Sequence, residues 1–297
     1  MSASSSSTWQ HQFIETNGIR LHYVTQGTGP LMLLLHGFPE FWYSWRYQIP
    51  FFAEHYTVVA VDLRGYNDSD KPAGTEAYGM SELVQDIHGV ITGLGYDTCV
   101  LVGHDWGGAI AWSYAYAHPE RLDQLVILNC PHPQRFLDGF SSSPMQWLRS
   151  AYIGFFQLPG LPEWVMQAND YQFITQAFES MAFAPNAIQD TDIQAYKTAA
   201  AKPGALTAAL NYYRNLLNPR LWQQEWSILE VPTLMIWGLE DPAFEPALVE
   251  DMEDYVSELR RHLIPRCGHW VPQEYPDQVN QYMADFLGVG IVGADVA

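Results

Sequence analysis

Short apolar runs alternate with longer amphipathic stretches along much of the chain. The apolar runs have the length of buried strands and occupy residues 31–35, 56–62, 98–103, 123–128, 232–237 and 260–265. The amphipathic stretches have helical spacing and lie near residues 42–53, 79–94, 106–118, 245–257 and 275–287. Residues 10–25 predict a hairpin that turns at Asn17-Gly18. Strands that alternate with helices predict a mainly parallel sheet with helices on both faces.

The strand pattern stops between Pro131 and about Trp226. Aromatic residues recur there at helix-like spacing, and prolines interrupt the stretch. We therefore expect a helical lid after the sixth strand, with residues 131–226 as the lid and residues 1–130 and 227–297 as the two parts of the core. Packing within the lid accounts for most of these aromatic side chains, but their density also favours an apolar pocket and a lipophilic substrate.

The pentapeptide Gly103-His104-Asp105-Trp106-Gly107 stands between a predicted strand and a predicted helix. A strand, a sharp turn and a helix form the setting of the nucleophile elbow, where small residues allow the strained turn to pack closely. An aspartate at the centre suits attack on an sp3 carbon that carries a leaving group, and it would form an ester with the enzyme. Taken alone, Asp105 could instead cap the following helix.

Two further residues complete the order of nucleophile, acid and histidine that this fold uses. Asp241 and His269 each follow a predicted strand closely. That edge of an open parallel sheet is where ligands bind. Separately, Asp241 could cap a helix that begins near Pro242, and His269 could be an ordinary histidine. Because both accompany Asp105 in order, we expect a catalytic triad.

A fourth pattern, His36-Gly37-Phe38-Pro39, ends the predicted strand at 31–35. The loop after the third strand supplies one oxyanion donor in this fold. The backbone N–H groups of Phe38 and Trp106 should therefore point at the oxygen that becomes negative when a tetrahedral intermediate forms. The tight turn also favours a cis Phe38–Pro39 bond.

Several segments in this order resemble the epoxide hydrolases of the α/β-hydrolase superfamily. The resemblance runs from about Phe13 to Leu287, and it is carried by residues 36–50, 62–66, 103–108, 131–133, 211–215 and 268–270. It implies an α/β-hydrolase fold with an eight-stranded, mainly parallel sheet and an inserted helical lid. It also implies an enzyme that adds water to an epoxide and releases a vicinal diol.

The resemblance further implies two lid tyrosines that hold the epoxide oxygen. They align with Tyr152 and Tyr213, because Tyr213 takes the third place of the Asn211–Asn215 segment. On a helix the adjacent Tyr212 would point about 100° away, so only one of the pair can face the pocket. Lid packing is the alternative role for either residue. The expected substrate-binding set is His36, Phe38, Pro39, Trp106, Tyr152 and Tyr213.

The expected reaction has two stages and needs no metal or organic cofactor. Asp105 attacks an epoxide carbon while the tyrosines hold the oxygen, and His269, oriented by Asp241, then activates water to cleave the ester.

Other activities stay open. Haloalkane dehalogenases use the same triad but bind a halide through N–H donors, whereas this chain has Phe38 where they often have asparagine. A ligand-binding relative without activity would not need an intact triad. A serine esterase is excluded at the elbow because no Gly-X-Ser-X-Gly occurs.

The composition agrees with a water-soluble enzyme. The 297 residues suffice for one core with an insertion, and a net charge of −19 makes nucleic acid or an anionic membrane a poor partner. No run approaches the ~20 apolar residues of a membrane span. Three cysteines show no metal spacing and favour a reducing cytoplasm. Whether the chain is a monomer or a homodimer stays open.

Overall fold

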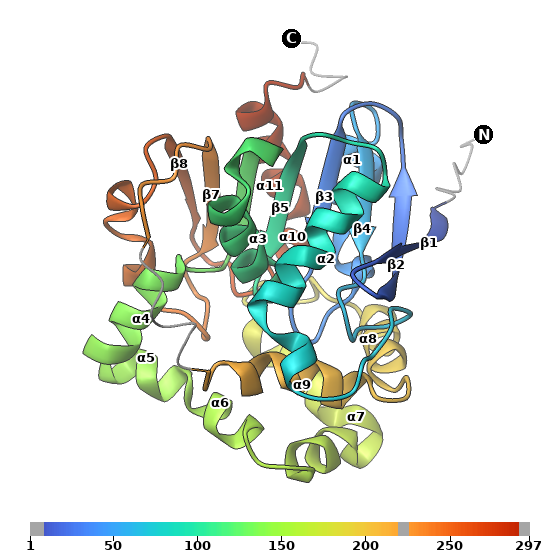
Figure 1. Cartoon of the computed structure of the whole chain (residues 1–297). Coiled ribbons are helices and arrows are strands. Elements are labelled where there is room, and N and C mark those ends of the chain that lie inside the picture. Colours follow the sequence, from blue (N-terminus) through green and yellow to red (C-terminus); the bar gives the residue numbers. More distant parts are fainter. Residues whose placement is uncertain (1–8, 219–225, 291–297) are drawn as a thin grey trace, which may run out of the picture.

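The computed structural model describes residues 9–218 and 226–290, and Figure 1 shows their arrangement. Within these residues an eight-stranded sheet has the order β1-β2-β4-β3-β5-β6-β7-β8. Its strands are β1 Gln10–Thr16, β2 Ile19–Gln26, β3 Leu31–Leu35, β4 Thr57–Val61, β5 Cys99–His104, β6 Leu122–Leu128, β7 Thr233–Gly238 and β8 Leu259–Ile264. The pairs β1–β2 and β2–β4 are antiparallel and the remaining pairs are parallel. The predicted sheet and hairpin are confirmed.

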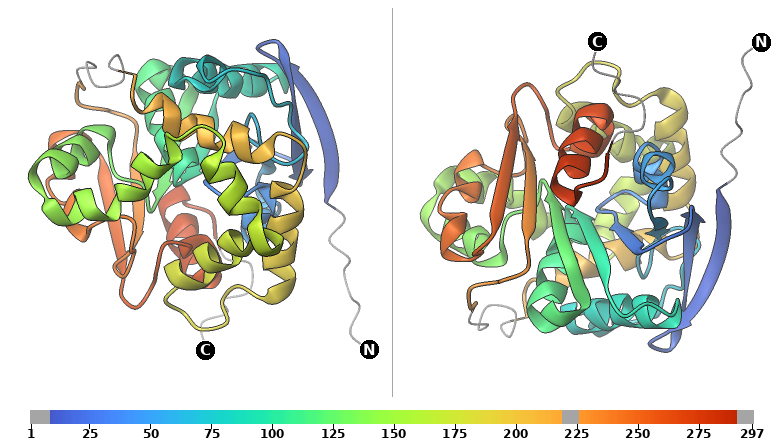
Figure 2. Two further views of the ribbon diagram at one scale, coloured as in Figure 1. Left: turned by 90° about the horizontal axis from the view of Figure 1, so that it is seen from below. Right: turned by 90° about the horizontal axis from the view of Figure 1, so that it is seen from above.

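Helices cover both faces of the sheet (Figures 1 and 2). Helices α2 Met80–Gly93 and α3 Trp106–Ala117 pack on one face, and α1 Gln48–Phe52 and α11 Pro276–Leu287 pack on the other. Successive residues of β3 alternate between the two cores, so the whole strand is buried. This explains why the central strands are continuous apolar runs.

Helices α4 to α9 follow β6 and precede β7 in the chain. They lie together beyond one end of the strands (Figure 1). Their bounds are α4 Pro133–Ser142, α5 Pro144–Arg149, α6 Ala151–Phe156, α7 Leu161–Met181, α8 Asp190–Ala200 and α9 Ala205–Asn215. Helix α7 is interrupted at Ala168–Tyr171, where the backbone leaves the helical region. The shorter elements are α10 Val271–Glu274 and the 3-10 turns η1 Trp42–Trp45, η2 Glu76–Tyr78 and η3 Pro119–Arg121.

Two helix predictions need correction. The stretch 245–257 contains only the 3-10 turns η5 Pro246–Val249 and η6 Met252–Asp254. Asp251, between them, has a left-handed φ of 52°, which a continuing right-handed helix does not allow. The apolar residues of this stretch have helix-like spacing because they are buried, and the spacing does not reflect a helix. The stretch 42–53 divides into η1 and α1, and Pro50 lies in the first turn of α1, where its missing N–H costs nothing.

A buried ion pair joins the loop after β4 to α2. The guanidinium of Arg64 donates to both carboxylate oxygens of Asp86, at 2.7 and 2.6 Å. We expect Asp86→Ala to lower the free energy of unfolding by about 3–5 kcal/mol, because it leaves the buried guanidinium unpaired. Urea titration measures this change. Asp97→Ala removes the exposed partner of Arg121 and serves as the control. Equal stabilities for the two variants would contradict the prediction.

Candidate active site

Asp105 stands at the turn between β5 and α3. Its backbone has φ 50° and ψ −120°, and although it occupies the N-cap position its side chain makes no capping hydrogen bond. The turn is tightly packed, since a Cβ on Gly107 would lie 2.1 Å from the carbonyl oxygen of Leu35. Only a glycine fits there. Because the Asp105 side chain makes no capping hydrogen bond, its carboxylate can face other groups, and a role for Asp105 as a helix cap finds no support.

The Asp105 carboxylate faces the loop after β3 on one side and His269 on the other. The Phe38 N–H donates to Oδ1 of Asp105 at 2.8 Å. Oδ2 lies 3.7 Å from Nε2 of His269, and Nδ1 of His269 lies 2.8 Å from Oδ2 of Asp241. The structure therefore brings together the three residues that were predicted to form a triad.

Two groups in addition to His269 hold the carboxylate of Asp241. Asn129, directly after β6, donates from its side-chain amide to Oδ2 of Asp241 at 2.6 Å, and the Ala243 N–H donates to Oδ1 at 2.7 Å. Burial alone would raise the pKa of Asp241, but His269 and these donors lower it. Asn129 was not predicted, although its place directly after a strand could have drawn attention to it.

His269 lies between two carboxylates and is almost completely buried. Burial disfavours its charged form, but the charge of Asp241 and the hydrogen bonds with Asp105 and Asp241 outweigh this and raise the pKa of His269 well above its ordinary value. The Asp105 charge thus contributes to the basicity of the imidazole.

Glu40 and His104 join the surrounding loops, and neither was predicted. Oε2 of Glu40 accepts from the Gly37 N–H at 2.9 Å and lies 2.8 Å from Nδ1 of His104. Nε2 of His104 lies 2.8 Å from the carbonyl oxygen of His269. Burial would raise the pKa of Glu40, but His104 and the Gly37 N–H lower it to about 2.

Two lid tyrosines complete the surroundings of the elbow. The rings of Tyr152 on α6 and Tyr213 on α9 lie 5.8 Å apart, and the Tyr213 ring lies 5.1 Å from that of Trp106. Burial, together with nearby charge that includes Asp105, raises the pKa of both hydroxyls. The ring of Tyr212 also lies near Trp106, at 5.4 Å, but its hydroxyl donates to the Arg64 carbonyl at 2.6 Å. Of the pair, Tyr213 is the one whose pKa the Asp105 charge raises.

Comparison with known proteins shows the family of the chain. The family model of the α/β-hydrolase fold matches residues 30–274. Epoxide hydrolase 3 of Xenopus tropicalis is 43% identical over 96% of this chain and 79% of its own length. Human epoxide hydrolase 4 is 41% identical over 92% of this chain and 77% of its own length. The chain belongs to the epoxide hydrolases of the α/β-hydrolase family.

A crystal structure of a Bacillus megaterium epoxide hydrolase in complex with an inhibitor has the same fold. It superposes with a TM-score of 0.86 at 36% identity, over 93% of this chain and 100% of that one. The dehalogenase alternative is not favoured by these relatives.

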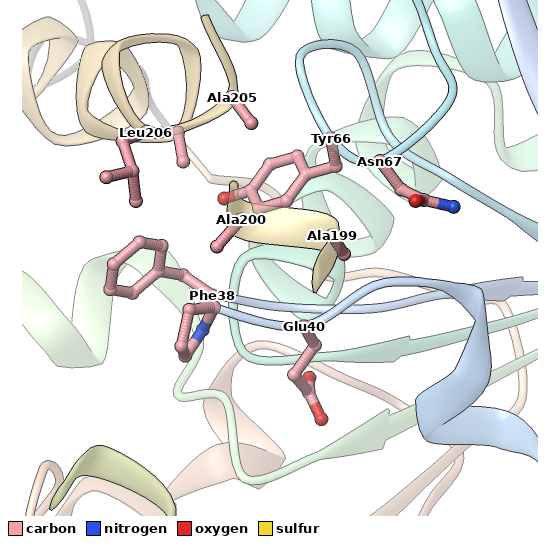
Figure 3. A pocket seen from close by; sticks show the side chains of 10 residues that line it. Phe38, Glu40, Tyr66, Asn67, Ala199, Ala200, Ala205 and Leu206 are labelled. Carbon is pink, nitrogen blue, oxygen red and sulfur yellow. The ribbon is translucent and has the colours of Figure 1, made fainter. Parts of the chain in front are cut away.

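The main cavity of this epoxide hydrolase has a volume of about 590 Å³. It opens beside the elbow, and its wall includes Asp105, Trp106, Tyr152, Ile153, Tyr213 and Phe244. A second pocket of about 20 Å³ lies beside Phe38 and Pro39, and Figure 3 shows Phe38, Tyr66 and Leu206 at its border. The second pocket has room for about one water. An epoxide of ordinary size therefore fits only the larger cavity.

Three of the predicted substrate-binding residues, His36, Phe38 and Pro39, are not among the residues that line the larger cavity, and Phe38 and Pro39 line the second pocket instead. Nδ1 of His36 lies 2.8 Å from the Gly37 carbonyl, and its Nε2 accepts from the Leu63 N–H at 3.1 Å. Both ring nitrogens are occupied, so the predicted substrate contact of His36 finds no support in this geometry. Its ring holds the loop after β3 against the loop after β4.

No cluster of three or more His, Cys, Asp or Glu side chains among residues 9–218 and 226–290 is placed to share a metal ion. No helix in the same ranges has both the length and the hydropathy of a membrane span.

The depressed pKa of Glu40 predicts a dependence of stability on pH. The folded-state pKa of about 2 lies below the ordinary pKa of 4.5, so this contribution to stability is complete above pH 4.5 and is lost as the pH falls toward 2. Glu40→Gln removes the titration. The difference in unfolding free energy between wild type and variant should therefore shrink by about 2 kcal/mol between pH 5 and pH 3. Urea titrations at both pH values measure it, and a constant difference would contradict the prediction.

Proposed function

We propose that this epoxide hydrolase forms a covalent ester between Asp105 and the epoxide, and then hydrolyses that ester to release a vicinal diol. The observation that carries the proposal is the position of the Asp105 carboxylate, which borders the main cavity and lies 3.7 Å from Nε2 of His269. A carboxylate so placed can attack a carbon of a substrate in the cavity, and the imidazole lies within reach of a water that attacks the resulting ester.

Ring opening needs a proton donor, because the departing alkoxide is a poor leaving group. We assign this role to the hydroxyls of Tyr152 and Tyr213. Their raised pKa values keep both protonated at neutral pH, and both side chains line the same cavity as Asp105. As the C–O bond breaks, the oxygen takes a proton from this pair, and the Asp105 oxygen forms the new bond to carbon.

The second stage follows from the charges around His269. Asp105 loses its negative charge when it becomes an ester, so one of the interactions that raise the pKa of His269 disappears. The imidazole can then release its proton, which restores the tyrosine hydroxyl that protonated the ring oxygen. The neutral imidazole acts as a base and takes a proton from the water that attacks the ester. The N–H groups of Phe38 and Trp106 are proposed to stabilise the oxyanion at the Asp105 carbonyl. The 2.8 Å bond from Phe38 to Oδ1 supports the first of these donors.

The halide-displacing alternative lacks support at the lid. Two hydroxyl donors near the elbow suit a ring oxygen, which accepts a proton, better than they suit a halide ion.

We propose residues 131–226 as the lid and neutral lipophilic epoxides as the substrates; residues 219–225 of that lid lie outside the described residues. The three unpaired, buried cysteines are compatible with a reducing cytoplasm. Either a monomer or a homodimer would support the chemistry.

Trapping the ester tests the proposed function. His269→Gln should allow attack by Asp105 but block hydrolysis, because the amide cannot act as a base. Incubation with styrene oxide should raise the intact mass by one epoxide, on the peptide that contains Asp105. Asp105→Ala in the same background is the control and should gain nothing. An unchanged mass for His269→Gln, or label on another residue, would contradict the covalent route.

Adjacent tyrosines offer a matched pair of variants. Tyr213→Phe should slow ring opening by about 10²-fold, since it removes a proton donor. Tyr212→Phe should leave the rate within about two-fold while it lowers unfolding stability by about 1 kcal/mol through the lost bond to Arg64. Stopped-flow kinetics under single-turnover conditions and urea titration measure the two effects. A slower rate for Tyr212→Phe than for Tyr213→Phe would reverse the assignment.

A further inference from the structure

The outer surface of the segment 144–165 has an unusual composition. The segment covers α5, α6 and the start of α7, and Figure 2, left, looks onto this side of the molecule. Its exposed residues carry no charge and are Pro144, Met145, Trp147, Leu148, Ala151, Tyr152, Gly154, Leu158, Pro159, Gly160, Leu161, Trp164 and Val165. We call these residues the apolar lid face.

The charged residues of the same segment are bound inside the protein. Arg149 donates to the Asp241 carbonyl at 2.6 Å and to the Phe244 carbonyl at 3.2 Å. Glu163 pairs with Arg214 at 3.0 Å. Neither group therefore offers an outward charge to solvent or to a partner.

Helix α5 exposes apolar side chains and buries a polar one, which is the reverse of a typical surface helix. Trp147 and Leu148 are 58% and 63% exposed, whereas Gln146 is buried and donates to the Ala243 carbonyl at 3.0 Å. Trp164, on α7, is 69% exposed. A water-facing helix normally shows the opposite pattern, and a contiguous apolar patch marks an interaction site.

The apolar lid face reaches the cavity. Tyr152 and Ile153 line the cavity beside Asp105, whereas their neighbours Ala151 and Gly154 are exposed. The apolar lid face and the wall of the cavity therefore meet on α6, so a lipophilic molecule held at this face lies beside the cavity.

We propose that the apolar lid face docks on a neutral, zwitterionic lipid surface, from which the enzyme takes epoxides dissolved in the lipid. Exposed tryptophans on an apolar surface, here Trp147 and Trp164, suit the boundary between lipid and water. The net charge of −19 opposes docking on an anionic surface and also opposes close approach of a second copy. The delivery of substrate rests on the proposed function, whereas the docking does not.

Flotation with phosphatidylcholine vesicles tests the docking. The wild-type chain should float with the vesicles, and the double variant Trp147→Glu/Trp164→Glu should bind at least ten-fold more weakly. Leu263→Glu, at an exposed apolar position on β8 outside the lid, should bind like wild type. Vesicles of phosphatidylglycerol should bind the wild-type chain more weakly than phosphatidylcholine. Absence of wild-type binding, or equal binding by the double variant, would overturn the proposal.

Kinetics and sedimentation separate the remaining outcomes. The double variant should hydrolyse styrene oxide in solution within about two-fold of wild type, but a long-chain epoxide held in vesicles at least ten-fold more slowly. Vesicle binding without turnover of either epoxide would reject the proposed function and keep the docking. A wild-type dimer in analytical ultracentrifugation that the double variant loses would assign the face to a second copy and reject the lipid.

Discussion

An imidazole held between two carboxylates is the arrangement on which the proposed chemistry depends. Asp241 binds one ring nitrogen of His269 at 2.8 Å, and Asp105 lies 3.7 Å from the other. Of these two carboxylates, only Asp105 loses its charge during the proposed reaction, when it becomes an ester. The same histidine can therefore be a stable cation beside a free carboxylate and a base beside an ester, without any movement of the backbone.

The fold makes this arrangement possible by bringing distant segments to one edge of a parallel sheet. Asp105 follows β5, Asp241 follows β7, and His269 follows β8. The elbow packs so closely that a side chain on Gly107 would meet the Leu35 carbonyl at 2.1 Å. The absence of a side chain at Gly107 therefore allows the turn to approach the end of β3, which leads into the loop that carries the Phe38 N–H. Helices α6 and α9 then place Tyr152 and Tyr213 in the wall of the same cavity as the carboxylate.

The sequence predicted the sheet well, since each observed strand after the hairpin begins and ends within one residue of its apolar run. The helix predicted at 245–257 was wrong. Leu248 and Met252 are buried and have the spacing of one helical turn, but Asp251 between them has a left-handed backbone. The roles of Asn129, Glu40 and His104 rest on partners far away in sequence, which the pattern of apolar positions does not reveal. For example, Glu40 meets His104 across 64 positions. The choice of Tyr213 over Tyr212 came from family resemblance, and the bond from Tyr212 to Arg64 supplies its physical reason.

The origin of the oxygen in the first diol tests the central claim most directly. Excess enzyme reacts once with styrene oxide in 18O-labelled water, and mass spectrometry measures the label in the product. Attack by Asp105 predicts that the first diol carries unlabelled oxygen from the carboxylate, and that the label appears in the enzyme. Full labelling of the first diol would mean that water attacks the epoxide directly, which would contradict the account.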